Sequence, residues 1–128
     1  MNRLISSHLM INMFWVGGLS LTTLLQSACA DEKTTAFFER SIRPVFLTHC
    51  AGCHGPEKQE SGLRLDSRES MILGGNRGTA LVPGKPNESR ILQAVEHLPD
   101  LKMPPDKKLH PQDIAHLKRW IQLSAPWP

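Results

Sequence analysis

The 128-residue sequence predicts a small all-α domain of about four short helices joined by loops. Apolar residues recur at the helical period in several segments, whereas no segment keeps the alternation of a half-buried strand. Prolines and glycines separate these segments. A domain of this size with few aromatic residues has a marginal hydrophobic core, so we expect a disulfide, a metal or a cofactor to complete it.

Residues 1–30 are typical of an export signal, because Arg3 precedes an apolar stretch at 9–25 and small residues close the segment. The stretch is short and contains polar residues, which disfavours an uncleaved membrane anchor. Cys29 raises another alternative, a lipoprotein-type signal in which this cysteine carries a lipid anchor. We prefer cleavage at the end of the segment, which predicts a periplasmic or otherwise exported domain.

The domain itself is predicted to occupy residues 37–128, after a short polar lead-in at 31–36. A helical period begins at Phe37 and is interrupted by Pro44, which lacks an N–H group and clashes with the carbonyl four residues earlier. The helix should therefore kink there, or a new helix should start with Pro44 in its first turn. The residues predicted to lie near one face are Phe38, Ile42, Val45, Phe46 and His49.

A second helix is predicted within residues 66–75. Asp66 is expected to cap its N-terminus, and Gly74 can adopt the left-handed conformation that ends it. The "GGNRG" sequence at 74–78 matches no phosphate-binding template, so it indicates a turn.

Two more helices are predicted at 87–97 and 111–123. Asn87 is the expected cap of the first. His110 precedes the second, and we expect it to cap less well than a serine or threonine would. The prolines between these helices exclude a continuous helix there.

The main chemical signal is "THCAGCHGPE" at 48–57, in which His54 directly follows Cys50 and Cys53. A thioredoxin-like pair would need a βαβ pattern, a structural zinc site a second ligand pair, and an iron–sulfur cluster normally four cysteines. Covalent haem, by contrast, fits the two cysteines and one histidine of this motif. Two thiols about one helical turn apart can add to two vinyl groups along one side of a porphyrin, and the adjacent histidine can bind iron.

Met103 is the expected second axial ligand, because two prolines after it stiffen the segment that presents its thioether. Met71, inside the second helix, is expected to fill the core instead. Ligation by a second histidine is the next alternative, and a five-coordinate iron the third. We expect His49 to lie beside the cofactor, and the other histidines to lie at the surface: His97 as a helix cap, His110 and His116.

The ordered motifs resemble the planctomycete-type cytochrome c domain family over about residues 37–128. They are "FFERSIRPVFLTHCAGCHGPEKQESGLRLDSRES", "LVPGKPNESRIL", "LKMPPDKKL" and "RWIQLSAPWP". The resemblance implies a mono-haem, all-α cytochrome c-like fold whose first and last helices pack together. It also implies thioether bonds to haem c at Cys50 and Cys53, and axial ligation by His54 and Met103.

These features predict an electron carrier, and not an enzyme, because a six-coordinate iron leaves no open position for a substrate. The alternatives are a gas or redox sensor or small peroxidase with an open position, and a haem module separated from a larger multidomain oxidoreductase, since the family domain usually precedes other domains. Arg64 and Lys85 are candidate partners of the haem propionates.

The expected partners are redox proteins. Lysines flank Met103 and could form a docking rim for an acidic partner, although a solvated loop is the interpretation that we favour. The net charge of +3 is mild, so nucleic acid is not an implied partner, and a membrane is implied only through the signal or a lipid at Cys29. The lysines are Lys102, Lys107 and Lys108.

Overall fold

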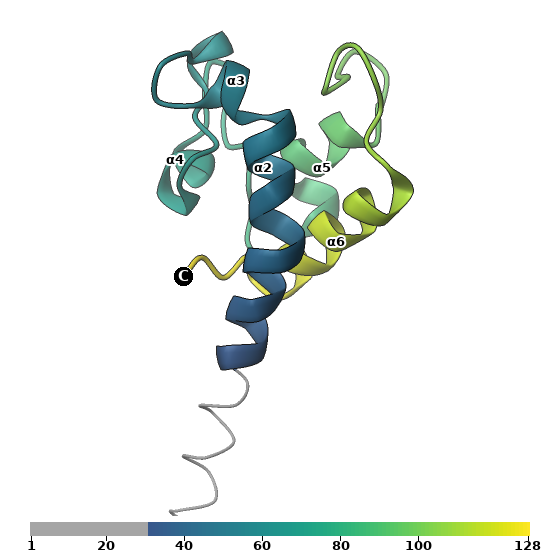
Figure 1. Ribbon diagram of the computed structural model, residues 1–128. Coiled ribbons are helices and arrows are strands. Elements are labelled where there is room, and N and C mark those ends of the chain that lie inside the picture. Colours follow the sequence, from purple (N-terminus) through teal and green to yellow (C-terminus); the bar gives the residue numbers. More distant parts are fainter. Residues whose placement is uncertain (1–30) are drawn as a thin grey trace, which may run out of the picture.

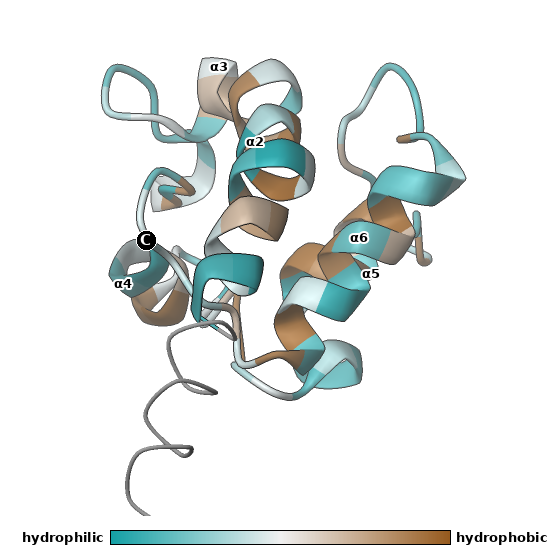
Figure 2. Cartoon of the chain, turned by 60° about the horizontal axis from the view of Figure 1, so that its bottom comes forward, coloured by the Kyte–Doolittle hydropathy of each residue, from teal (hydrophilic) through white to brown (hydrophobic). Residues whose placement is uncertain are grey.

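The computed structural model describes residues 31–128, so the predicted export signal lies outside the described residues. Helices are the regular elements of this part, which confirms the all-α class (Figure 1). Helix α2 stands between α4 on one side and α5 and α6 on the other (Figures 1 and 2). In chain order the elements are η1 (Phe38–Ile42), α2 (Arg43–His49), α3 (Ala51–His54), η2 (Glu60–Gly62), α4 (Arg68–Leu73), η3 (Pro86–Glu88), α5 (Arg90–Val95) and α6 (Pro111–Gln122).

The N-terminal helix changes its hydrogen-bonding pattern just before Pro44. The polar residues 31–36 are helical and continue into η1, a π-helical turn in which the Arg43 N–H bonds to the Phe38 carbonyl five residues earlier. The wider π turn accommodates the ring of Pro44 and its missing N–H group. Helix α2 then starts with Pro44 in its first turn, as one of the two sequence-based alternatives predicted.

The few aromatic residues of the domain gather in one cluster where the first and last helices meet. The rings of Phe38 and Trp127 have centroids 4.7 Å apart, and Phe46 packs edge-on against Trp120 at 5.6 Å. Trp120 is completely buried, and its indole N–H donates a 2.8 Å hydrogen bond to the Pro126 carbonyl. This cluster joins η1 and α2 to α6 and leaves the other end of α2 free to form the site described below.

Helix α6 has one buried face and one solvated face, as expected for a helix at the edge of a small core (Figure 2). His110 caps it, because its Nδ1 atom accepts a 3.2 Å hydrogen bond from the Gln112 N–H. The capping distance is at the long end for such a bond, in keeping with the expected weaker cap. No helix in residues 31–128 is long and apolar enough to cross a membrane.

The predicted cap of α4 is wrong by one residue. The hydroxyl of Ser67, and not the carboxylate of Asp66, accepts the hydrogen bond from the Ser70 N–H. Asp66 instead forms an ion pair with Arg64 at 2.6 Å, and this guanidinium holds the pKa of Asp66 below its usual value. Gly74 ends the helix with a φ of 78°, as the glycine signal indicated.

The start of α5 also differs from the prediction. Asn87 lies in the 3₁₀ turn η3, and α5 begins after Ser89, which is completely buried. The Ser89 hydroxyl accepts a 3.0 Å hydrogen bond from the Val82 N–H and lies 2.9 Å from the Lys85 carbonyl, to which it can donate. Ser89 therefore anchors the preceding loop, a role that depends on tertiary structure.

We expect Ser89→Ala to lower the free energy of unfolding by about 1–3 kcal/mol, because it leaves the partly buried Val82 N–H without its partner. Urea unfolding of the variant and the wild type measures this difference. Asn87→Ala is the matched control, since Asn87 is exposed and should change stability by less than about 0.5 kcal/mol. Equal losses in the two variants would contradict the role assigned to Ser89.

Candidate haem site

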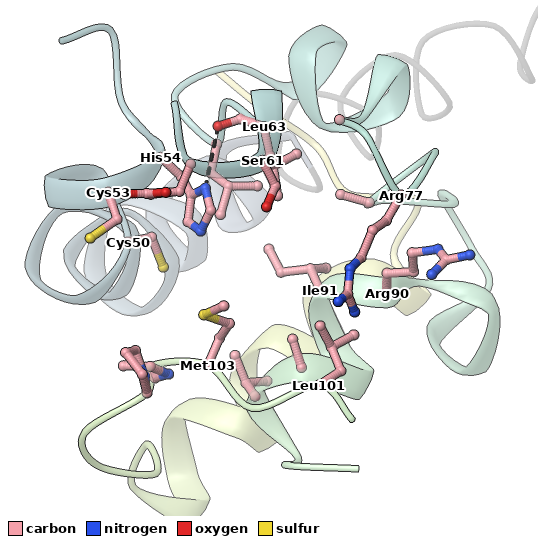
Figure 3. Close-up of a pocket in the computed structure, with 18 of the residues that line it drawn as sticks. Cys50, Cys53, His54, Ser61, Leu63, Arg77, Arg90, Ile91, Leu101 and Met103 are labelled. Carbon is pink, nitrogen blue, oxygen red and sulfur yellow. Dashed lines mark hydrogen bonds between the residues drawn. The ribbon is translucent and has the colours of Figure 1, made fainter. Parts of the chain in front are cut away.

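An apolar cavity of about 360 Å³ lies between the α2–α3 junction, the turn at 75–78, α5 and the segment 101–105 (Figure 3). This volume is within the range of small-molecule and cofactor pockets. Its apolar lining comes from Leu63, Leu65, Ala80, Ile91, Ala94, Val95 and Leu101. The cavity can accommodate a cofactor of the kind that we expected to complete the small, aromatic-poor core.

The C-x-x-C-H turn forms one wall of this cavity. Helix α3 is a single turn in which the N–H groups of Cys53 and His54 both bond to the Cys50 carbonyl, at 3.1 and 2.8 Å. The turn places both sulfur atoms at the same end of the cavity (Figure 3). A side chain at Gly55 would meet the Ala51 carbonyl oxygen at 2.5 Å, so a glycine is required directly after this turn.

Both cysteines are free thiols, so the structure contains no disulfide between them. Cys53 is exposed, whereas burial raises the pKa of the Cys50 thiol to about 11. The Cys50 sulfur lies 3.9 Å from the Val45 carbonyl oxygen, to which its S–H can donate. A partly buried thiol that stays protonated is a poor nucleophile for disulfide exchange.

His54 is held by its backbone and by one ring nitrogen. Its side chain is 8% exposed, and Nδ1 lies 3.3 Å from the Leu63 carbonyl oxygen. When Nδ1 carries the proton and donates to this carbonyl, Nε2 has a free lone pair, and Figure 3 shows the ring directed into the cavity. A metal-binding histidine normally donates its second N–H in this way, which fixes the tautomer and the ring orientation.

Met103 faces the C-x-x-C-H turn from the opposite wall (Figure 3). Its N–H donates a 2.9 Å hydrogen bond to the carbonyl of Ala94 in α5, and Pro104 and Pro105 also line the cavity. Met103 is 39% exposed, which is unusual for a large apolar residue. Met71, by contrast, is completely buried in the core, as predicted.

The histidines expected at the surface do not line the cavity, whereas His49 does. His116 packs edge-on against Phe37 with ring centroids 5.7 Å apart. His97 differs from the expected surface cap: it follows α5 with a φ of 59°, and its Nε2 atom is buried without a hydrogen-bond partner.

The structure does not bring Arg64 or Lys85 to the cavity. Arg64 pairs with Asp66, and Lys85 pairs with Glu88 at 3.1 Å. The arginines that line the cavity are Arg77 and Arg90. Sequence reasoning missed both, because one lies in the predicted "GGNRG" turn and the other at the start of a helix, and neither is near the motif in sequence.

The donor groups fit covalent haem better than the other metal sites. The described residues contain no cluster of three or more His, Cys, Asp or Glu side chains that could hold a metal ion, so a zinc site lacks its ligands there. An apolar cavity with two thiols and an imidazole on one wall, and a thioether on the other, offers what a haem attached through two vinyl groups needs. The fold and the site thus have the features expected of a small c-type haem domain.

Comparison with known families makes this assignment more specific. The model of the family described as "Planctomycete cytochrome C" matches residues 50–107, a shorter stretch than the resemblance suggested. The matched stretch includes Cys50, Cys53, His54 and Met103. The match supports the resemblance to the planctomycete cytochrome c family over this stretch, and a domain of that family implies covalent haem c and haem-based electron transfer. No curated protein and no solved structure matches the chain.

Proposed function

We propose that this protein is an exported mono-haem c-type cytochrome that transfers single electrons through an iron bound by His54 and Met103. The observation that carries the proposal is the placement of the C-x-x-C-H turn and Met103 on opposite walls of one apolar cavity. One haem is proposed because the sequence holds one C-x-x-C-H motif.

Each of the four residues has a separate role in this proposal. Cys50 and Cys53 would hold the haem through thioether bonds, and His54 and Met103 would bind its iron. Bound haem supplies one-electron chemistry, which no side chain of this domain can supply. The protein acts as a carrier and not as a catalyst, because two axial ligands leave no position for a substrate.

The surrounding residues would keep the site fixed during electron transfer. The Leu63 carbonyl orients the imidazole of His54, and the Ala94 carbonyl holds the backbone of Met103 against α5. The apolar lining excludes water and favours the less charged state of a bound redox centre. Because both ligands come from positions tied to helices by backbone hydrogen bonds, little needs to rearrange when an electron moves.

Optical spectroscopy of the purified holoprotein tests this function. We expect a low-spin ferric spectrum with the weak far-red band of a sulfur–iron bond. We also expect the ferrous form to bind carbon monoxide poorly, because Met103 would occupy the second axial position of the iron. A high-spin ferric form that binds carbon monoxide readily after reduction would contradict the carrier function and favour the sensor or peroxidase alternative.

Export and partner choice belong to the same proposal. Residues 1–30 would direct the chain to the periplasm or another exported location, with Cys29 removed or carrying a lipid. The partners would be redox proteins that approach the edge near Met103, where Lys102 and Lys107 are exposed. The ammonium group of Lys108 donates a 2.7 Å hydrogen bond to the Glu96 carbonyl, so it is the most constrained cation of this rim.

A further inference from the structure

The cavity has two chemically different ends. The sulfur atoms of Cys50 and Cys53 lie at one end, and the side chains of Arg77 and Arg90 lie together at the other (Figure 3). Ile91 and Leu101 lie between them. We propose that Arg77 and Arg90 bind the two propionate groups of the haem and thereby set its orientation and raise its reduction potential. This inference rests on the proposed function.

Neither guanidinium is neutralised by a carboxylate of this domain. The ion pairs within residues 31–128 are Arg43–Glu39, Lys58–Glu60, Arg64–Asp66 and Lys85–Glu88. Glu60 is the carboxylate among the cavity-lining residues, and it is already paired with Lys58 at 2.8 Å. Arg77 and Arg90 are both exposed, so they place two positive charges at the open end of the apolar cavity, where they would attract an anion.

Both arginines project from fixed backbone. The turn that carries Arg77 is closed by hydrogen bonds between Gly75 and Gly78, and the Asn76 N–H donates to the Ser61 carbonyl at 2.8 Å. A side chain at Gly75 would meet the Ser61 carbonyl oxygen at 2.6 Å, so this turn packs tightly against the neighbouring loop. Arg90 is the first residue of α5, whose next N–H, of Ile91, donates to the Ala80 carbonyl.

The Arg77 side chain reaches toward the opposite wall of the cavity. Its Nη1 atom lies 3.4 Å from the Asp100 carbonyl oxygen, a long contact that uses one of the guanidinium's donors. The remaining donors are available to an anion. Arginine binds carboxylates through two parallel N–H···O bonds, which supply orientation as well as charge.

The arrangement of the substituents on haem matches the two chemically different ends of the cavity. Its two vinyl groups lie along one side of the ring, and its two propionates lie at the side away from them. Thioether bonds at Cys50 and Cys53 would fix the first side and turn the carboxylates toward Arg77 and Arg90. A second guanidinium is needed because there are two carboxylates, which explains why both arginines line the same end of the cavity.

The test uses holoprotein produced with a c-type haem maturation system, and it measures the midpoint reduction potential. We expect Arg77→Gln and Arg90→Gln each to lower the potential, and the double variant to lower it further. Removing a positive charge near the iron disfavours the reduced state, which carries one positive charge fewer. Arg77→Lys should recover part of the loss, because it restores the charge without the planar fork.

Arg64→Gln and Lys85→Gln are the matched controls, since each removes a cation that is paired outside the cavity. We expect both to keep the wild-type potential. The inference is overturned if Arg77→Gln and Arg90→Gln, with haem bound in wild-type amount, have the same potential as these controls. If the double variant does not fold, the midpoint potentials of the two single variants test the inference. A wild-type protein without covalent haem would instead overturn the proposed function.

Discussion

Replacing both Cys50 and Cys53 by alanine will produce a protein without covalent haem. The two sulfur atoms lie at one end of a single cavity, and no other cysteine belongs to residues 31–128. Without these thiols, no sulfur atom can add to the vinyl groups, and any haem that enters the cavity is held by axial ligands alone. Electrophoresis under denaturing conditions with a haem stain measures this, and the double variant should show no stained band.

The single variants refine this experiment. Cys50→Ala and Cys53→Ala each leave one thioether bond, so a fraction of the protein should keep its haem, with one unreacted vinyl group that shifts the pyridine haemochrome band to the red. Cys29→Ala is the matched control, because this cysteine lies outside the C-x-x-C-H motif. Haem that stays bound to the double variant after denaturation would show that attachment occurs elsewhere.

Met103→Leu will remove the far-red sulfur–iron band and lower the midpoint potential by on the order of 0.1 V, because axial ligand changes shift haem potentials over a range of about 0.8 V. Leucine keeps the approximate volume and the apolar character of methionine but has no donor atom. The hydrogen bond of the Met103 N–H to Ala94 is a backbone contact and remains. Spectra and redox titrations of the holoprotein measure both effects.

Met71→Leu provides the control for the loss of a methionine as such. Met71 is completely buried in the core, where an isosteric replacement should cost less than about 1.5 kcal/mol of stability. We therefore expect it to keep the sulfur band and the wild-type potential. If the band survives Met103→Leu and disappears in Met71→Leu, the assignment of the second axial ligand is wrong.

The sequence predicted the parts of the fold that depend on local chemistry. The C-x-x-C-H turn is set by the spacing of its own residues, and the break at Pro44 follows from the ring and missing N–H of proline. Gly74 ends α4 because the backbone needs a positive φ there. These features lie within a few residues of the signals that indicate them, so they can be inferred without knowledge of tertiary contacts.

The features that the sequence did not reveal depend on contacts between distant segments. Ser89 was overlooked because its hydroxyl binds the loop before α5, and this loop is placed by tertiary packing. Asp66 has the right chemistry for a cap, but its ion pair with Arg64 competes for the carboxylate. In the cavity, Arg77 and Arg90 come together only after the turn at 75–78 and α5 have packed, so sequence position could not identify them.

The intact mass of the exported protein under denaturing conditions tests the central claim most directly. Denaturation removes any haem that is held only by axial ligands, so what remains reports covalent attachment. We predict a red protein whose mass equals that of its polypeptide plus one haem. A colourless product with the mass of the polypeptide alone would contradict the assignment of Cys50, Cys53 and His54 to a haem site.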